Sequence, residues 1–432
     1  MLLIFLNAFL IERWTRNDKR MHQSLNKRVA IIGGGAAGFF TALSLAEQNT
    51  SVAIDLFEKR KEWLSKVMVS GGGRCNVTHH CFDPKQLSEH YPRGSRELRA
   101  AFHAWQPTDT IAWFEERGID LKTEVDGRMF PTTDDSQTII DCFMSEVAQH
   151  SIQLKKGQGV ESISVTAEGQ FLLKLDEQTY ENYDAVCLAL GSMKGSSLEG
   201  SIQKLGHHIE PLAPSLFAFN VNDSRVQSLS GVSVPKARVW LDSIKQSQMG
   251  PLLITHRGMS GPAILKLSAW KARTLKDQNY HFTFYVNWLG VSTHDEVLKA
   301  FNRQRIEAGK RSVKNTPLFE LPKRLWESLV SYAQISNENT WSQLSKKAEQ
   351  SLITELIAGR YEAQGKTTNK EEFVTCGGVS RKEIDFKSME SKCVPKLFFA
   401  GECIDIDGIT GGFNFQAAWT TGRLAGSAMA QI

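Results

Sequence analysis

Three glycines near the start of the chain have the spacing that binds phosphate. Gly33, Gly35 and Gly38 follow the pattern G-x-G-x-x-G, in which a tight turn lets the backbone approach a pyrophosphate. The apolar run at 28–32 before them is typical of a buried strand, and the segment 39–47 after them has helical apolar spacing. The N-terminus of that helix would face the phosphate charge.

An acidic residue follows at the distance that such a site requires. A second apolar run at 52–57 ends in Glu58, about 20 residues beyond the last glycine, where a carboxylate binds a ribose hydroxyl. A lone glycine pattern is a weak signal, but here strand, turn, helix, strand and acid occur in order. The sequence therefore predicts a dinucleotide site near the start of the chain.

A second glycine cluster lies at 70–76, where the sequence reads Ser-Gly-Gly-Gly-Arg-Cys-Asn. Consecutive glycines let the backbone pack against a flat or charged group, and Arg74, Cys75 and Asn76 are unusual residues for a linker. We expect this loop to cover the cofactor. Two interpretations of Cys75 stay open, a small buried side chain or a thiol that faces the redox centre, and the first is favoured. Two interpretations of Arg128 also stay open: it contacts the substrate, or it pairs with a surface acid.

The C-terminal part returns to the same kind of pattern. An apolar run at 396–400 ends in Gly401 and Glu402, and Gly411 and Gly412 then open a helix. A carboxylate at a strand end can bind a sugar alcohol, and a helix N-terminus stabilises a ring that becomes anionic. The helix also carries small residues that would let it lie close to a neighbour, namely Ala417, Ala418, Gly422, Ala425 and Gly426.

Between these parts, residues 207–372 contain no nucleotide pattern. Short apolar runs separated by glycine and proline predict a small barrel or sandwich, and three helices are expected through 294–358. The heptapeptide at 256–262, His-Arg-Gly-Met-Ser-Gly-Pro, is either a tight corner or a loop that enters an active site. Earlier in the chain, alternating residues at 152–164 and 170–175 predict a small hairpin layer.

Composition limits the classes of protein that fit. The chain has 432 residues, 41% hydrophobic and 23% charged, with net charge +4, which suits two or three globular domains and is too mild to imply nucleic-acid binding. Seven cysteines form no C-x-x-C pair and no zinc spacing. We therefore expect reduced thiols, a cytoplasmic protein and no metal site.

The first residues need a separate interpretation. Residues 1–11 are apolar but too few to span a membrane, and the basic residues that would precede the apolar run of a signal peptide follow it instead. We expect residues 1–20 to be an upstream extension, with Met21 or a nearby codon as the working start. The alternative is a weak peripheral membrane anchor.

These motifs together resemble those of the BaiN-like family of NAD(P)/FAD-dependent oxidoreductases, also called YhiN-like or aminoacetone-oxidase-like flavoproteins. Their order and combination over 27–432 make the resemblance specific. The motifs that carry it are Ile-Ile-Gly-Gly-Gly-Ala-Ala-Gly at 31–38, Ser-Gly-Gly-Gly-Arg-Cys-Asn at 70–76, Gly-Arg-Met-Phe-Pro at 127–131, Ser-Gly-Pro-Ala-Ile-Leu at 260–265, Gly-Gly-Val-Ser at 377–380, Gly-Glu at 401–402 and Gly-Gly-Phe-Asn at 411–414.

The resemblance implies an α/β fold, a discontinuous FAD-binding Rossmann-like domain of the glutathione-reductase type with an inserted small β-barrel and a helical subdomain. The FAD-binding domain would comprise 27–206 and 373–432, after an N-terminal extension at 1–26. The inserted domain would be 207–372. Its barrel would take up about 207–292 and 359–372, and its helical subdomain about 293–358.

The resemblance also implies which residues bind FAD. Adenosine and pyrophosphate would lie at 33–38 and Glu58, with adenine touching the backbone of Val160, ribitol on Glu402, and the flavin facing 411–414. One departure from the family pattern lies next to the expected contact at Gly191, where the chain reads Leu-Ala-Leu-Gly-Ser-Met-Lys at 188–194. The expected cofactor residues are Gly33, Gly35, Ala36, Ala37, Gly38, Glu58, Lys59, Gly72, Gly73, Arg74, Cys75, Asn76, Val160, Gly191, Gly401, Glu402, Gly411, Gly412, Phe413 and Asn414.

The implied function is that of an FAD-dependent oxidoreductase, which acts on a small organic substrate by hydride transfer through a non-covalently bound flavin. Since no second glycine pattern is present, NADH or NADPH would serve as a transient electron donor at the flavin. The reactions of the family include amine oxidation and reduction of steroid-like alkenes, so an amine oxidase that uses oxygen is an alternative.

A different class of function also stays open, an FAD-bearing RNA-modification or RNA-binding protein. In that case basic residues in the expected helices would contact phosphate. Such charges more often form a solvated helical face, so we expect no nucleic-acid partner. No catalytic residue and no oligomeric state are predicted. The basic residues concerned are Lys310, Arg311, Lys323 and Arg324.

Overall fold

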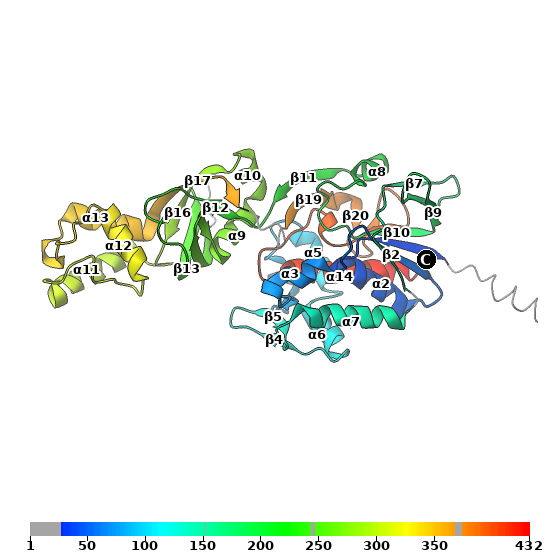
Figure 1. Ribbon diagram of the computed structural model, residues 1–432, viewed down its shortest axis with the longest axis horizontal. Helices are drawn as coiled ribbons and strands as arrows, with labels where there is room; N and C mark the ends of the chain where they lie inside the picture. Colours follow the sequence, from blue (N-terminus) through cyan, green and yellow to red (C-terminus); the bar gives the residue numbers. More distant parts are fainter. Residues whose placement is uncertain (1–26, 151, 243–246, 368–373) are drawn as a thin grey trace, which may run out of the picture.

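The computed structural model describes residues 27–150, 152–242, 247–367 and 374–432. The expectations for 1–26 fall outside these ranges. Figure 1 shows an elongated chain with two parts side by side. Within the described ranges, no helix has both the length and the apolar composition needed to cross a membrane.

The larger part is built on a seven-stranded sheet with the order β20-β21-β22-β10-β1-β2-β6. Five neighbouring strands run parallel, and the two short strands at one edge are antiparallel. The first strand is central and four of its five residues are buried, as expected for a parallel sheet covered on both faces. The strands are β1 (Arg28–Ile32), β2 (Ala53–Glu58), β6 (Ile152–Lys156), β10 (Ala185–Leu188), β20 (Ile384–Asp385), β21 (Glu390–Ser391) and β22 (Leu397–Phe399).

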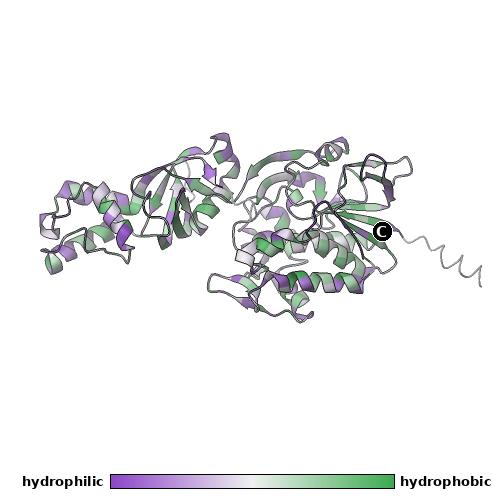
Figure 2. Cartoon of the chain, in the orientation of Figure 1, coloured by the Kyte–Doolittle hydropathy of each residue, from purple (hydrophilic) through white to green (hydrophobic). Residues whose placement is uncertain are grey.

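Helices and two small sheets surround this sheet, whose strands are largely hydrophobic (Figure 2), and buried residues of the sheet and of the helices form one core. The small sheets are β3-β5-β4 and β7-β8-β9. Their strands are β3 (Thr78–His79), β4 (Leu121–Thr123), β5 (Arg128–Pro131), β7 (Ser162–Val165), β8 (Phe171–Lys174) and β9 (Tyr180–Tyr183). The helices are α2 (Ala36–Gln48), α3 (Ser65–Gly73), α4 (Pro84–Ser88), α5 (Ser95–Phe102), α6 (Pro107–Glu115), α7 (Ser136–Gln149), α8 (Glu199–Lys204) and α14 (Phe413–Met429).

One expectation about the strands is wrong in part. Residues 152–164 do not all belong to a hairpin layer, because β6 pairs with β2 as the parallel edge of the large sheet. Only its first residue, Ile152, is buried and the other four are half-buried or exposed, as in an edge strand, and such partial exposure is also typical of a hairpin. The expected hairpin is present further on, where β7 pairs with β8.

Small residues let α14 lie directly on α2, as the sequence predicts. A Cβ on Gly422 would lie 2.9 Å from the carbonyl oxygen of Ala37, and a Cβ on Gly426 would lie 2.5 Å from that of Thr41. Side chains at these two positions would push the backbones apart. The first and last helices of this part are therefore fixed against each other by backbone contact.

The smaller part, on the left of Figure 1, has its own core. Its seven-stranded sheet has the order β17-β16-β13-β14-β15-β12-β18, and its two edge strands are consecutive in the chain at Gly365, as in a barrel that closes on itself. The elements are β12 (Ala218–Asn220), β13 (Ser233–Leu241), β14 (Gln248–Thr255), β15 (Gly258–Ser260), α9 (Pro262–Trp270), α10 (Ala272–Asp277), β16 (His281–Asn287), α11 (His294–Ala308), α12 (Lys323–Tyr332), α13 (Lys346–Ala358), β17 (Gly359–Gln364) and β18 (Lys366–Thr367).

Two strands connect the parts. β11 (Ile209–Pro214) leads into the smaller part, β19 (Thr375–Val379) leads back, and the two pair antiparallel. The chain therefore enters and leaves the smaller part at the same place. We propose that the domain boundaries lie at this pair, close to the limits expected from the sequence.

The contact between α2 and α14 can be tested by adding one methyl group. Gly426→Ala should destabilise the protein by about 1–3 kcal/mol, because the new Cβ overpacks the backbone at Thr41. Gly200→Ala is the matched control, since a Cβ at this position in α8 meets no described atom within 4 Å. Urea unfolding followed by circular dichroism measures both variants. An unchanged midpoint for Gly426→Ala would contradict the contact.

Candidate functional site

The first glycine turn leaves an open space at one of its three glycines. A Cβ on Gly33 would lie 2.2 Å from the carbonyl oxygen of Ala189, and one on Gly38 would lie 1.8 Å from that of Gly33. A Cβ on Gly35, by contrast, would meet no described atom within 4 Å beyond its chain neighbours. Packing therefore requires the outer two glycines, whereas the middle one borders space that a ligand can fill.

The helix that follows has the electrostatics of an anion site. α2 begins directly after Gly35, and its first turn has neither a side-chain cap nor an acidic residue. Its first amide N–H groups and the helix dipole are then available to a phosphate. Beside the turn, the Glu58 carboxylate accepts hydrogen bonds from the amides of Gly34 (2.9 Å) and Arg60 (2.8 Å). These features fit a dinucleotide with its pyrophosphate on α2.

The second glycine loop forms a sharp break at the end of α3. Gly71, Gly72 and Gly73 all have positive φ, and a Cβ on either of the last two would meet no described atom within 4 Å. The Arg74 side chain points to the small sheet, where it pairs with Glu124 at 2.6 Å. The loop is open enough to cover a cofactor with its backbone, but the side chain of Arg74 is engaged elsewhere.

Cys75 is a packed side chain. It is fully buried, and burial raises the pKa of its thiol to about 12. This burial agrees with the favoured interpretation of Cys75 as a small packed side chain, since a thiol held neutral is a poor nucleophile, and its expected contact with FAD stays a prediction. Arg128 pairs with Asp126 at 2.8 Å and with Glu124 at 2.8 Å, as the surface-acid interpretation predicts.

The N-terminus of α14 lies against the second glycine loop. Asn76, with its amide oriented to satisfy its neighbours, donates to the carbonyl of Thr78 (3.0 Å) and accepts from the amide of Gly412 (2.9 Å). A Cβ on Gly412 would lie 2.4 Å from the Thr78 oxygen. Asn76 therefore holds the Gly412 amide in this structure, and the expected contact of residues 411–414 with the flavin stays a prediction.

The other amides at the N-terminus of α14 are suited to bind an anionic group. The first helical bond runs from Gln416 to Gly412, so the amides of 413–415 lie outside the helical bonding. The first turn has no acidic residue and no side-chain cap. The Asn414 side chain bonds to both the amide (2.8 Å) and the carbonyl (3.0 Å) of Gly408, which closes the loop before the helix.

A carboxylate lies between the two glycine regions. Glu402 accepts from the Thr375 amide at 2.9 Å and pairs with Lys66 at 2.7 Å. Its side chain keeps 19% of its surface exposed, which leaves room for a sugar hydroxyl. Gly401, with φ of +73°, lies against Ala37 at the start of α2. The expected ribitol contact of Glu402 stays a prediction that this placement supports.

The remaining expected cofactor residues lie at the carboxyl ends of neighbouring strands. Gly191 follows β10 with φ of +69°, and a Cβ there would meet no described atom within 4 Å. The Val160 carbonyl accepts a hydrogen bond from Ser197 at 3.0 Å, and Lys59 is exposed after β2. Their contacts with FAD stay predictions.

Two histidines that the sequence gave no reason to select flank the start of α14. The ring of His79 lies 4.5 Å from that of Phe413, and the ring of His90 lies 4.3 Å from it. The Nδ1–H of His79 donates to the Gly411 carbonyl at 2.8 Å. Burial lowers the pKa of both imidazoles, that of His90 to about 4, so both are neutral at physiological pH.

A lysine of the smaller part acts electrostatically on this pair. The positive charge of Lys266, on α9, lowers the pKa of both His79 and His90. Burial lowers the pKa of Lys266 itself, and the charge of Asp126 opposes that effect. The two imidazoles therefore lie within the electric field of a half-buried lysine. Isolated histidines and a helical lysine have no motif, which is why sequence patterns missed them.

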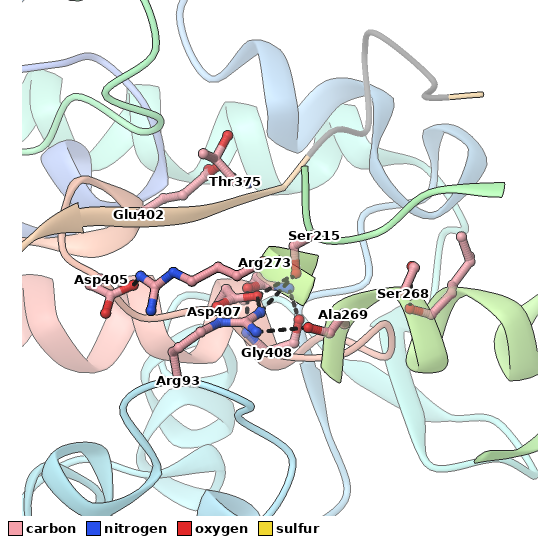
Figure 3. Close-up of polar contacts among 12 residues, drawn as sticks. Arg93, Ser215, Ser268, Ala269, Arg273, Thr375, Glu402, Asp405, Asp407 and Gly408 are labelled. Carbon is pink, nitrogen blue, oxygen red and sulfur yellow. Dashed lines mark hydrogen bonds and ion pairs between the residues drawn. The ribbon is translucent and has the colours of Figure 1, made fainter. Parts of the chain in front are cut away.

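A buried ion pair holds α9 in place (Figure 3). The Arg93 guanidinium makes a two-point contact with Asp407, donates to the Ala269 carbonyl at 2.8 Å, and lies 3.2 Å from the Ser215 hydroxyl. Asp407 belongs to the loop before α14, Ser215 to the connection between the parts, and Ala269 to the end of α9. Arg273 pairs with the adjacent Asp405 at 2.8 Å.

The heptapeptide at 256–262 is a tight corner, one of the two expected alternatives. Gly258, with φ of +146°, lies so close to β12 that a Cβ would come within 2.2 Å of the Phe219 oxygen. The corner borders a hollow of about 220 Å³, lined by His256 and Arg257 among other polar residues. Its last two residues, Gly261 and Pro262, form the start of α9. The motif therefore positions the helix that carries Lys266.

Comparisons with known proteins agree with this geometry. A profile of the family "HI0933-like protein Rossmann domain" matches residues 27–428. The chain is 30% identical over 407 residues to "Ribosomal RNA dihydrouridine synthase" of Escherichia coli K12, covering 90% of this chain and 95% of that protein. It is 27% identical over 421 residues to "3-dehydro-bile acid delta(4,6)-reductase" of Clostridium scindens, covering 94% and 99%. Among solved structures it resembles E. coli quinol fumarate reductase, with 15% identity, TM-score 0.46, and coverage of 94% and 70%.

The open space at Gly35 gives a direct test of cofactor binding. Gly35→Val should reduce FAD affinity at least tenfold, because its side chain fills the space expected for the pyrophosphate. The apoprotein should keep its stability, since Gly35 has a φ of −97° that any residue adopts and its Cβ has room. FAD content and fluorescence titration measure the first effect, and thermal unfolding the second. A stable variant that binds FAD normally would show that the pyrophosphate lies elsewhere.

Cysteine reactivity tests the burial of the second glycine loop. Iodoacetamide at pH 8 should alkylate Cys393, which is exposed, and leave Cys75 unmodified in the folded protein. Peptide mass spectrometry measures both sites, and the urea-unfolded protein shows that each can react. Rapid labelling of Cys75 in the native protein would mean that its thiol is accessible.

Proposed function

Because the chain belongs to the family with the HI0933-like Rossmann domain, we propose that it is an FAD-dependent reductase of a carbon–carbon double bond conjugated to a carbonyl. The chain is an FAD-dependent oxidoreductase of the BaiN-like type, and the proposal concerns its reaction. The observation that carries it is the N-terminus of α14, whose first turn has neither a side-chain cap nor an acidic residue and therefore suits a redox ring that becomes anionic on reduction. Such a reduction needs hydride from a cofactor and a proton from an acid.

The residues present fit FAD. The amides of α2 and the space at Gly35 suit the pyrophosphate, Glu58 and Glu402 suit the two sugar portions, and the start of α14 suits the flavin. Bound FAD would supply two electrons as hydride. The protein would hold the cofactor by its backbone, stabilise negative charge on the ring with a helix dipole, and exclude water through the smaller part.

The names of the relatives share this chemistry. Dihydrouridine is uridine with its ring double bond saturated, and that bond is conjugated to a carbonyl. A 3-dehydro-bile acid with double bonds at positions 4 and 6 is also a conjugated ketone. Both named activities therefore add hydride and a proton across an activated alkene, which supports the same reaction class for this chain.

Amine oxidation fits the site less well. A protonated amine would be repelled by the positive charge of Lys266, which acts on both His79 and His90. The charge of Asp126 acts on both His79 and Lys266, but this residue is paired with Arg128. A neutral or anionic acceptor suits these charges better.

Uridine in ribosomal RNA is a second candidate substrate, favoured by the charge of the smaller part. Residues 207–372 carry 22 Lys and Arg against 15 Asp and Glu, whereas the rest of the chain carries 29 against 32. Lys310, Arg311, Lys323 and Arg324 are all exposed. An excess of exposed positive charge binds phosphate without sequence preference. The expectation that no nucleic acid takes part stays a prediction, and this candidate opposes it.

The proposed electron donor is NADH or NADPH, which would visit the flavin directly. Within the described ranges, neither part contains a second unit of strand, glycine turn and helix like the one that begins at β1. A donor that binds transiently needs no such element.

A single experiment separates these functions. The FAD-loaded protein is photoreduced without oxygen and mixed with cyclohex-2-enone, an unmodified ribosomal RNA transcript, a primary amine, or air-saturated buffer. We expect an alkene or the RNA to reoxidise the flavin at least tenfold faster than oxygen does, with a product 2 Da heavier. The RNA reaction should weaken steeply with salt. Reoxidation by oxygen alone, with peroxide release and amine turnover, would contradict the proposal.

A further inference from the structure

The smaller part contains a polar hollow that the proposed reaction does not use. It lies where β12, β14 and β17 end, and its volume is about 220 Å³. Pockets for whole drug-sized ligands begin at roughly 300 Å³, so this hollow suits one small polar group or one unit of a longer molecule. The polar residues that line it include Asn220, Asn222, Gln227, His256, Arg257 and Gln364.

The backbone around the hollow is held in place by close contacts. A Cβ on Gly258 would lie 2.5 Å from the amide nitrogen of Val221, so only glycine lets the two loops come this close. The Val221 amide donates to the Arg257 carbonyl at 2.9 Å, and the Asn220 amide donates to the Gly365 carbonyl at 3.1 Å. The lining is therefore formed by the fold itself before any ligand binds.

The lining offers hydrogen-bond donors that the protein does not use. The Gln227 amide donates to the Oδ1 of Asn222, and the Nδ2 of Asn222 has no acceptor among the described residues. Asn220 is arranged in the same way, since its Oδ1 accepts from the Thr367 hydroxyl at 2.6 Å. The guanidinium of Arg257 forms no hydrogen bond or ion pair within the described part of the chain. Unused donors of this kind suit a ligand that is rich in acceptors.

The charges around the hollow favour an anion. Among the described residues that line it, none is acidic. Asp223, which adjoins Asn222 in the chain, is held by Arg225 through hydrogen bonds of 2.7 and 2.9 Å. Arg324, on α12, donates to the carbonyl of Ser228 and so adds a second cation beside this loop. A guanidinium matches the oxygens of a phosphate in geometry as well as in charge.

We propose that this hollow binds the phosphate and sugar of a nucleotide, with the guanidinium of Arg257 on the phosphate. Arginine and asparagine side chains are typical donors to phosphate and sugar oxygens. The same chemistry is present in a free nucleotide and in each unit of an RNA chain, and the excess of basic residues in 207–372 favours the chain. For RNA the inference rests on the second candidate function, whereas the binding itself does not depend on FAD.

The test measures binding to the full chain without turnover. The probes are a fluorescein-labelled single-stranded RNA followed by anisotropy, and UMP and inorganic phosphate followed by calorimetry. Arg257→Gln should weaken binding of the RNA or of UMP about tenfold or more, which is what a hydrogen bond to a charged group contributes. For RNA it should also reduce the slope of log affinity against log salt by about 0.7, the loss of one phosphate contact on a single strand.

Two further variants separate the hollow from general charge. Asn222→Asp keeps the acceptor for Gln227 but places a carboxylate in the hollow, and should also weaken binding about tenfold or more. Arg303→Gln is the matched control, since it removes one positive charge from an exposed site on α11 of the same part. It should change affinity less than twofold. Thermal unfolding checks that each variant is folded.

Hydrogen exchange measured by mass spectrometry locates the bound probe. Exchange in residues 220–228 and 255–258 should slow when the probe is added to the wild type and should not change in Arg257→Gln. Dependence on Arg257 with both UMP and RNA would identify a free-nucleotide site, and dependence with RNA alone would identify an RNA subsite. Either result supports the inference.

The contrary outcomes are equally distinct. Wild-type affinity in both Arg257→Gln and Asn222→Asp, an equal loss in Arg303→Gln, or no binding of any probe would overturn the site. Binding of inorganic phosphate without UMP or RNA would overturn its assignment to a nucleotide. None of these results bears on the reductase function, because that function is tested by flavin reoxidation and this site by binding alone.

Discussion

The backbone contact between α2 and α14 is the constraint on which the site depends. Because Gly422 and Gly426 have no side chains, the backbone of α14 packs directly against the backbone of α2. The N-termini of these helices, which we propose to bind the pyrophosphate and the flavin, belong to distant parts of the sequence. Direct backbone contact fixes their separation more strictly than flexible side chains could. A cofactor with a pyrophosphate at one end and a redox ring at the other requires that separation.

A second constraint links the smaller part to the larger part. Arg93 and Asp407 are both almost fully buried, and a buried ion pair is favourable only when its remaining hydrogen-bonding groups are satisfied. Here Ser215 and the Ala269 carbonyl satisfy them. Because these partners belong to the connection and to α9, the pair links the two parts of the molecule.

Structural features that have a strong local cause could be predicted from the sequence. Gly33 and Gly38 were identifiable because only glycine fits their turn, and the small residues of α14 because their spacing is helical. The sequence of the edge strand β6 predicts a hairpin strand, because a half-exposed strand has the same sequence pattern in a hairpin and at the edge of a large sheet. His79, His90 and Lys266 could not be found, because their role comes from three segments meeting in space. The engagement of the Gly412 amide by Asn76 was also hidden, since nothing local signals a side chain reaching a distant helix end.

The most direct measurement is a crystal structure of the chain with FAD bound. The account predicts the pyrophosphate against the amides at the start of α2, beside Gly35. It predicts the flavin ring at the start of α14, beside His79 and His90. An FAD molecule bound elsewhere would contradict it.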